Sequence, residues 1–407
     1  RHEYTYKAKT NMTSKKYIVP MSSPDINEDD QQVVMDTLKT RYLSIGPQIK
    51  TFEGSFRNFT GAAEAVGVNS GTSGLHLCVI SAGISEGDLV ITTPFSFVSS
   101  TNVILFEKAI PIFIDIDPLT GNLDVEQVKQ AVEDLTSNDM DKRSKWLPRK
   151  MKKKAGPLKA ILSVDVFGQP ADYDPLLEIT KKHGLILIED SCEALGAEYK
   201  HKKAGRFGDF GVFAFYPNKQ ITTGEGGMVI TENRAYADML RALRNQGRAP
   251  GDTWLQHTYL GFNYRLDELS AALGISQMMR VEQLLNNRQK VADWYNSKLE
   301  NIKGIQKPYI SPDTTRMSWF VYVIRLEKQI DRDGFAEKLD HAGIPVRPYF
   351  LPIHLQPYMV ETFGYQLGDY PVTEDIGNRS LALPFSGVMA EEQVDIVCEN
   401  LSKCLKN

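Results

Sequence analysis

The sequence predicts an α/β fold, with a mixed, mostly parallel sheet flanked by helices in a large domain and a smaller C-terminal α+β domain. Short apolar runs alternate with amphipathic stretches between about residues 63 and 231, which favours right-handed strand–helix–strand crossovers. From about Gln306 the pattern changes to a few short strand-like and helix-like stretches. We expect a flexible N-terminal segment over residues 1–17, the large domain over 18–280 and the small domain over 281–407.

Composition and charge exclude several classes of protein. The chain has 407 residues, 42% hydrophobic and 24% charged, as is typical of a globular protein. Its net charge of −4 indicates neither a nucleic-acid nor a membrane partner, and no apolar run reaches the roughly 18 residues of a transmembrane helix. The four cysteines lack metal-type spacing, so we expect no metal site. The polar first sixteen residues, with Met12 as a candidate start, lack a signal-peptide core and predict a cytoplasmic protein.

The spacing of apolar side chains predicts the elements of the large domain. Asn27 is a candidate cap for a helix that runs to about Thr40, with the apolar residues 33, 34 and 38 on one face. Further helices are expected over residues 49–59, 75–82, 124–135, 174–183 and 235–245, and one follows residues 94–101. Strands are expected over residues 63–68, 88–92, 110–114, 160–166, 185–189, 210–216 and 228–231.

Lys219 stands in a turn-rich loop directly after the apolar run 210–216. Lysine is rarely buried without a partner, so its position after a core strand indicates a special role. A neutral lysine amine is a nucleophile that forms Schiff bases with carbonyl groups. Chemistry with pyridoxal phosphate (PLP) needs such a lysine and a carboxylate for the pyridinium nitrogen, and Asp190 ends the strand expected over 185–189. A surface lysine in a hairpin is the alternative interpretation.

A second candidate site is the turn Asn69-Ser-Gly-Thr-Ser-Gly74, which opens the helix expected from Leu75. The free N–H groups and the dipole of a helix N-terminus both favour a phosphate. A plain helix cap is the alternative interpretation of this turn.

Three segments together resemble the DegT/DnrJ/EryC1/StrS family of PLP-dependent sugar aminotransferases. They are residues 188–197, with Asp190 near the start, the sequence Gly-Asp-Phe-Gly at 208–211, and residues 218–227 around Lys219. The resemblance extends from about Pro20 to the C-terminus. It implies the aspartate aminotransferase fold (fold type I), a large PLP-binding domain, and PLP as cofactor with pyridoxamine phosphate as its second form.

The resemblance also implies roles for individual residues. Lys219 would hold PLP covalently and shuttle a proton, and Asp190 would keep the pyridine nitrogen protonated. Thr72 and Ser73 would bind the phosphate. Phe97 would stack on the pyridine ring, although core packing is common for a phenylalanine.

Two residues depart from the pattern of many relatives. Glu193 stands where many have Gln near the phenolic oxygen of the cofactor, and an ionised carboxylate would repel that oxygen. We therefore expect Glu193 to be protonated or turned away. Ala214 stands where many have a phosphate-binding Ser. Asn263, in a family signature, would reach the phosphate of a partner subunit, which implies a homodimer with shared active sites, although a turn residue is its alternative reading.

The C-terminal part carries the candidate substrate-binding residues Arg347, Tyr349 and His354, which line the sugar-nucleotide site in the family. A surface ion pair and a capped histidine are equally weighted alternatives for Arg347 and His354. Helices are expected over residues 269–284, 281–299, 334–341 and 390–405, and strands over residues 319–324 and around 346.

The segment over residues 136–158 is longer than the corresponding link in the family and is rich in lysine and arginine, especially over residues 142–159. A run of charge is usually a solvated face, and we expect that here. A role near an anionic substrate is the alternative.

The resemblance implies transfer of an amino group from L-glutamate to the C4 or C3 keto group of a nucleotide-linked deoxy- or keto-hexose, in surface polysaccharide or aminosugar biosynthesis. A related dehydratase would carry His in place of Lys219, so that reaction is disfavoured. A cyclic ketone acceptor such as an inosose stays open. A non-catalytic protein of the same fold is a third alternative, which the presence of Lys219 and Asp190 disfavours.

Overall fold

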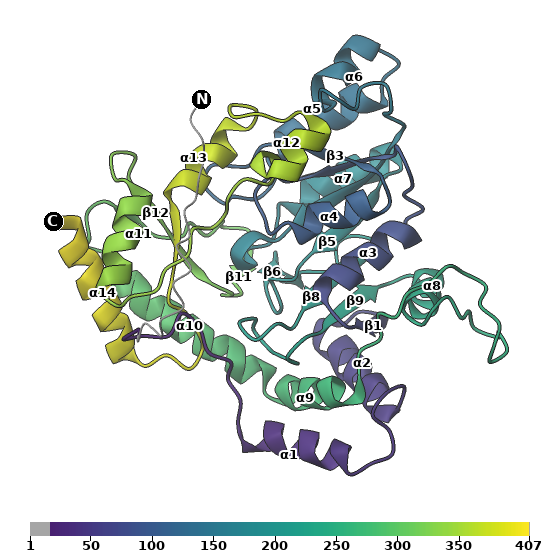
Figure 1. The fold of residues 1–407 in the computed structure, drawn as a ribbon, viewed down its shortest axis with the longest axis horizontal. Helices are drawn as coiled ribbons and strands as arrows, with labels where there is room; N and C mark the ends of the chain where they lie inside the picture. The colour runs from purple at the N-terminus through teal and green to yellow at the C-terminus, as the bar shows by residue number, and fades with distance from the viewer. Residues whose placement is uncertain (1–16, 407) are drawn as a thin grey trace.

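A computed structural model describes residues 17–406 of the chain (Figure 1). The flexible segment expected over residues 1–17 lies outside the described residues except for Tyr17. Within the described part, no helix combines the length and apolar character needed to cross a bilayer.

A seven-stranded sheet forms the centre of the large lobe, in the order β1-β9-β8-β5-β4-β2-β3. All seven expected strands are present, with ends within two residues of the predicted ones. Their bounds are β1 Glu64–Val68, β2 Leu89–Thr92, β3 Ile110–Phe113, β4 Leu158–Val164, β5 Ile186–Asp190, β8 Phe210–Ala214 and β9 Gly227–Thr231. The predicted α/β fold with a mixed, mostly parallel sheet is therefore confirmed.

Strand β9 is the exception to the parallel arrangement, since it runs antiparallel to both β1 and β8. The loop between β8 and β9 consequently leaves the sheet at the carboxyl end of β8. That end adjoins the carboxyl end of β5, where Asp190 pairs with Val212. Ligands collect at the carboxyl ends of strands in such sheets, so the topology brings Lys219 and Asp190 to the same edge.

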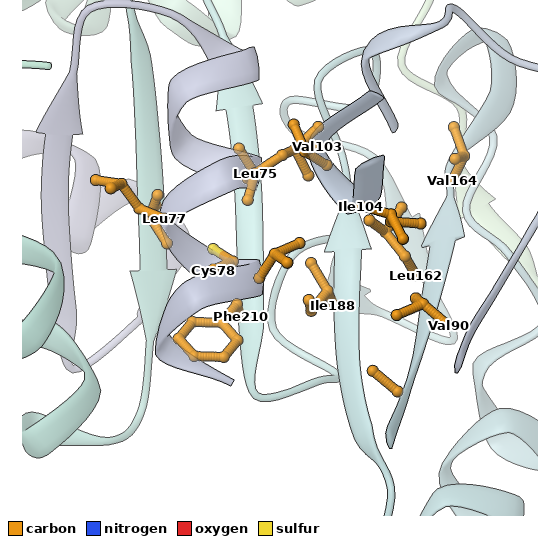
Figure 2. Close-up of a cluster of buried hydrophobic side chains, with 14 of the residues drawn as sticks. Leu75, Leu77, Cys78, Val90, Val103, Ile104, Leu162, Val164, Ile188 and Phe210 are labelled. Atoms are coloured by element: carbon orange, nitrogen blue, oxygen red, sulfur yellow. The ribbon is translucent and has the colours of Figure 1, made fainter. Parts of the chain in front are cut away.

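Helices cover both faces of this sheet (Figure 1). Their bounds are α2 Pro47–Thr60, α3 Gly71–Ser81, α4 Ser99–Phe106, α5 Val125–Thr136, α6 Met140–Trp146, α7 Tyr173–His183 and α8 Arg234–Arg244. Figure 2 shows the buried layer between the sheet and helices α3 and α4, with Leu75 and Cys78 facing Ile188 and Phe210. Removal of this apolar surface from water is the main term that favours folding.

Helix α1 (Glu28–Leu38) has the predicted cap, because the Asn27 side chain accepts a hydrogen bond from the Asp30 N–H at 2.9 Å. The predicted buried face is only partly observed. Val33 and Val34 are half-buried, but Leu38 is half exposed, and the fully covered residues are Asp30 and Thr37. The covered side thus includes polar residues, and Asp30 finds a charged partner in another element.

The C-terminal lobe contains the antiparallel sheet β10-β12-β13. Its strands are β10 Ile305–Gln306, β12 Tyr322–Leu326 and β13 Ser380–Leu383, and its helices are α10 Val281–Lys298, α11 Arg332–His341 and α14 Glu391–Lys406. The strand expected over 319–324 begins three residues late. The strand expected around Val346 is wrong, since that stretch makes only an isolated bridge between Arg347 and Ala382.

Several elements join the two lobes. Helix α9 (Glu268–Met279) leads into α10, whose Leu284 packs with the large lobe and whose Tyr295 packs with the small one. A small sheet pairs β11 (Thr314–Arg316) with the hairpin β6 (Glu198–Tyr199) and β7 (Lys202–Lys203). Helices α12 (Pro357–Phe363) and α13 (Pro371–Arg379), which the sequence analysis missed, lie over the large lobe (Figure 1).

Arg280, at the junction of α9 and α10, anchors the N-terminal segment. Its guanidinium lies 2.7 Å from an Asp25 carboxylate oxygen and 2.6 Å from an Asp30 oxygen. The Asp30 side chain is fully buried. Burial favours the neutral carboxyl, but hydrogen bonds from Ser276, Asn27 and Arg280 lower the pKa of Asp30 below its usual value.

Replacement of Arg280 by Met should destabilise the protein by about 3–5 kcal/mol, because it leaves a buried carboxylate without its cation. Arg316→Met is the matched control, since its partner Glu282 is exposed and such pairs contribute at most about 1 kcal/mol. Urea unfolding measures both changes. Equal losses in the two variants would contradict the argument.

The same variant should respond to pH. The lowered pKa of Asp30 gives the wild type a contribution that is present at neutral pH and is lost as pH falls through that pKa. Without Arg280, the pKa of this carboxyl is higher than in the wild type, because the cation no longer favours the charged form. The deficit of Arg280→Met should therefore shrink as pH falls from neutral through the usual pKa of an aspartate, about 4, whereas a constant deficit would show that Asp30 is not involved.

Candidate active site

Lys219 lies in an enclosed position at the carboxyl edge of the sheet, and its side chain is 13% exposed. Its Nζ lies 3.8 Å from Glu193 Oε1 and 3.8 Å from the centre of the Phe320 ring. The amine therefore rests on an aromatic face beside a single carboxylate. The surface-hairpin alternative does not fit this burial.

Asp190 ends β5 in a buried position, 7% exposed. One of its oxygens accepts a hydrogen bond from the Cys192 N–H at 3.2 Å. Burial raises the pKa of Asp190, although the charge of Lys219 acts in the opposite direction. No cation forms an ion pair with Asp190 among the described residues, so its carboxylate is suited to a positively charged group of a ligand.

The turn before α3 has the features of an anion site. Ser70 caps the helix by accepting a hydrogen bond from the Ser73 N–H at 3.0 Å. The N–H groups of Gly71 and Thr72 have no acceptor in the described part of the chain. A Cβ atom on Gly71 would lie 2.8 Å from Ala214 Cβ and from Cys192 Sγ, so only glycine allows this close approach.

Thr72 and Phe97 lie on two neighbouring segments of this edge. Thr72 Oγ1 donates to Ser99 Oγ at 3.0 Å, which joins the turn to the start of α4. The Phe97 ring is 65% exposed, so it does not belong to the core. Hydroxyl groups of Ser96 and Ser100 both donate to the Phe97 carbonyl, which fixes the backbone that carries the ring.

Glu193 is oriented by two contacts. Its Oε2 accepts a hydrogen bond from the Phe167 N–H at 2.8 Å, and its Oε1 faces Lys219. Burial raises the pKa of Glu193, while Lys219 and Phe167 act against this effect. The contact with Phe167 turns one oxygen away from Lys219, and the protonated form of Glu193 stays a prediction.

Arg288 is a site residue that the sequence analysis missed. It is 4% exposed, and it donates to the carbonyl groups of Lys219 at 2.6 Å, Asn218 at 3.0 Å and Phe320 at 3.2 Å. Burial lowers the pKa of Arg288 to about 10. The sequence feature that could have identified Arg288 is its place on the apolar face of a predicted helix, between Leu284 and Val291.

Near Lys219, three segments of the chain come into close contact at Gly168. A Cβ atom there would lie 1.6 Å from the Ser318 carbonyl oxygen and 2.8 Å from that of Glu193. Gln220 Nε2 donates to both the Glu193 carbonyl and Ser318 Oγ. This crossing joins the loop between β8 and β9, here called the catalytic loop, to the chain that enters β12. It therefore fixes Phe320 relative to Lys219.

Two of the expected substrate-binding residues lie near this site. Tyr349 stacks on Phe167, with ring centres 6.2 Å apart and an angle of 18°. Burial, with the charge of Glu193, raises the pKa of Tyr349 to about 12, and Arg347 acts against it. The Arg347 side chain is exposed and pairs with no carboxylate in the described part of the chain, so it is available for an anion.

His354 does not face the site. It is fully buried, and its Nε2 lies 2.8 Å from Glu374 Oε1. The prediction that His354 contacts the substrate is therefore wrong. The structure shows a buried histidine that is bonded to a carboxylate. Periodicity could not show this, because the partner lies twenty residues further along the chain.

Asn263 is exposed and lies beside the anion turn of its own chain. Its carbonyl oxygen accepts a hydrogen bond from Asn69 Nδ2 at 3.4 Å, and Tyr264 accepts one from the Asn69 N–H. The contribution to a partner subunit stays a prediction.

Comparison with known proteins identifies the family of this chain. A family model of the DegT/DnrJ/EryC1/StrS aminotransferases matches residues 24–402. The chain belongs to this family. The resemblance noted in the sequence is thereby confirmed, and with it the aminotransferase fold.

Individual members of the family are similar along their whole length. GDP-perosamine synthase of Caulobacter vibrioides is 33% identical over 391 residues, 95% of this chain and 98% of that protein. The spore coat polysaccharide biosynthesis protein SpsC of Bacillus subtilis is 32% identical over 405 residues, 96% of this chain and 98% of that protein. The structure of Helicobacter pylori PseC, an aminotransferase in pseudoaminic acid biosynthesis, matches with a TM-score of 0.83 and 26% identity, covering 96% of this chain and 100% of that one.

The protein is therefore a PLP-dependent transaminase of a sugar aminotransferase family, whose aminotransferases use PLP. The described residues fit that group. The turn at Gly71 offers unpaired N–H groups to a phosphate, Asp190 offers a buried carboxylate to a ring nitrogen, Phe97 offers an exposed ring face, and Lys219 offers an enclosed amine.

Ala214 allows a direct test of the phosphate site. Because its Cβ lies beside Gly71, Ala214→Ser should add a hydroxyl donor there and tighten PLP binding about fivefold, the worth of one hydrogen bond. Fluorescence titration of the apoprotein with PLP measures the affinity, and its thermal unfolding controls for a change of fold. Unchanged or weaker binding would mean that the phosphate lies elsewhere.

Proposed function

We propose that the protein transfers the amino group of L-glutamate to the C4 or C3 keto group of a nucleotide-linked deoxyhexose, in the biosynthesis of an aminosugar or a surface polysaccharide. The observation that carries the proposal is the enclosed Lys219 amine at the same sheet edge as the buried Asp190. The exposed side chain of Arg347 suits an anionic acceptor.

When bound, PLP supplies an electron sink that stabilises negative charge on the carbon next to the transferred amine. Lys219 would hold the cofactor covalently and, when free, would move a proton at its Nζ. Asp190 would accept a hydrogen bond from the ring nitrogen and keep the proton there. The wall formed by Phe320 and Glu193 limits access of water to Nζ.

The acceptor side is assigned to the segment around Arg347 and Tyr349. A guanidinium group binds phosphate through two parallel hydrogen bonds, and Arg347 is exposed without a carboxylate partner in the described residues. One relative is named GDP-perosamine synthase, and PseC is described as an aminotransferase in pseudoaminic acid biosynthesis, which supports a sugar nucleotide as the acceptor.

We further propose a homodimer in which Asn263 contributes to the partner's phosphate site. The hairpin before Asn263 exposes large apolar side chains, with Trp254 74%, Leu255 84% and Leu260 90% exposed. Exposed apolar surface of this kind marks an interaction site, and a second copy of the chain would cover it.

The first test is spectroscopic. Purified protein with PLP should absorb near the border of the visible and ultraviolet ranges, lose that band with L-glutamate, and regain it with one member of a panel of nucleotide keto-sugars. Lys219→Ala should reduce turnover to less than about a thousandth while unfolding like the wild type. Retained turnover would refute the role of Lys219, and a glutamate response that only a cyclic ketone reverses would favour that class of acceptor.

Subunit mixing tests the shared site. Asn263→Ala should weaken PLP retention, because it removes a hydrogen bond to a phosphate. If Asn263 acts across the interface, a mixed dimer of Asn263→Ala and Lys219→Ala subunits has one intact site. An equal mixture dialysed free of PLP should then show about a quarter of wild-type activity. Activity no higher than the sum of the two separate variants would place Asn263 in its own subunit's site.

A further inference from the structure

The lysine-rich segment over residues 137–157, here called the basic segment, keeps its lysine side chains exposed, as its sequence predicts, but other residues of the segment pack against the protein. It includes α6 and lies beside α12 at one end of the molecule (Figure 1). Leu147 is 7% exposed and belongs to the same core cluster as Phe363 and Tyr365. The segment therefore packs against the chain that follows the substrate-binding residues.

Arg143 links the two ends of the basic segment. It donates to the Leu135 carbonyl at 2.7 Å and to the Gly156 carbonyl at 2.8 Å, so that one side chain joins both ends of the segment. Trp146 Nε1 donates to Asp134 at 2.9 Å. These contacts hold the segment on α5 as a fixed platform.

Two basic residues reach from this platform to the C-terminus of α12. The Lys150 Nζ donates to the Glu361 carbonyl at 2.7 Å, and the Lys150 N–H donates to the Phe363 carbonyl at 3.2 Å. Arg149 donates to the Gly364 carbonyl at 3.1 Å. The last carbonyl groups of a helix carry partial negative charge, so both cations stabilise this end of α12.

Arg149 also forms a two-point ion pair with Asp369, with N–O distances of 2.6 and 2.7 Å. Asp369 is only 16% exposed in its side chain. Burial acts to raise the pKa of Asp369, but the hydrogen bonds from Arg149 lower it overall. Parallel hydrogen bonds of this kind fix direction as well as distance.

The loop held by Arg149 orients a buried pair. The Gly368 N–H donates to both Glu374 oxygens at 2.9 Å, and Glu374 binds His354 at 2.8 Å. Next to His354, the Ile353 N–H donates to the Pro94 carbonyl at 2.8 Å. The chain of contacts thus runs from the basic segment to the strand end that carries Phe97.

The residues just before this stretch form the aromatic wall of the site. Phe350 packs edge-on against Phe95 at 5.6 Å and stacks on Phe167 at 5.3 Å. Tyr349 stacks on Phe350 at 4.8 Å. Only Leu351 and Pro352 separate Phe350 from residues 353–370, so a shift of that stretch would act on this wall through the chain.

We propose that Arg149 is a positioning residue for the acceptor half of the reaction, which holds residues 353–370 so that Arg347 and Tyr349 meet the acceptor. The kinetic part of this inference rests on the proposed function. Arg149 itself touches none of the candidate site residues and acts through Asp369, Glu374 and His354. The donor half of the reaction, which depends on Lys219 and Asp190, should be indifferent to it.

The holoenzyme with Arg149→Met is compared with Lys152→Met, which removes the same charge from an exposed side chain of the same segment. Hydrogen exchange of the 357–370 amides should accelerate several-fold in Arg149→Met and stay unchanged in the control. For the keto-sugar that responds in the panel, kcat/KM should fall about ten- to a hundredfold, the effect of a small displacement of a binding group. The single-turnover rate with L-glutamate should stay at the wild-type value.

Each outcome has a distinct meaning. Equal loss in both half-reactions would show general destabilisation and overturn the proposal, as would an unchanged acceptor step. Asp369→Asn should reproduce the effect, and the double variant should lose no more than either single one, because both act through one ion pair. If no keto-sugar reacts, the proposed function fails, while hydrogen exchange still decides whether Arg149 holds the loop.

Discussion

The structure depends on keeping a lysine amine at the carboxyl edge of the sheet while shielding it from bulk water. A buried charge is costly unless partners offset it. Lys219 has a carboxylate, Glu193, on one side and the Phe320 ring on the other. The enclosure requires residues from the turn after β5, from the loop after β8 and from the chain that enters β12, so it exists only when both lobes are in place.

Arg288 explains how the two lobes are held in register at this point. Its guanidinium is surrounded by backbone carbonyl groups rather than carboxylates, and those carbonyls belong to the catalytic loop and to the entry of β12. Hydrogen bonds to a charged donor are stronger than neutral ones. The close crossing at Gly168 and Ser318 adds a steric constraint to the same junction. The same contacts therefore fix the positions of both Phe320 and Lys219.

The sequence predicts two departures from the family pattern. Ala214 lies beside Gly71, and in the proposed phosphate site the helix terminus would have to supply most of the binding through backbone groups. Glu193 lies beside Lys219, where burial raises its pKa and Phe167 holds one of its oxygens. The basic segment adds a third difference, far from the chemistry, which acts on the acceptor side through Asp369.

The sequence by itself determined the sheet strands, the family, and the lysine and carboxylate of the site, because these depend on local periodicity and on residues inside continuous motifs. It did not determine the antiparallel β9, the helices α12 and α13, the burial of His354, or the roles of Arg288 and Arg149. Each of these depends on contacts between segments distant in the chain, as in the pairing of His354 with Glu374 or of Arg149 with Asp369. Such contacts form only when packing brings the segments together, and the spacing of residues within one segment does not predict them.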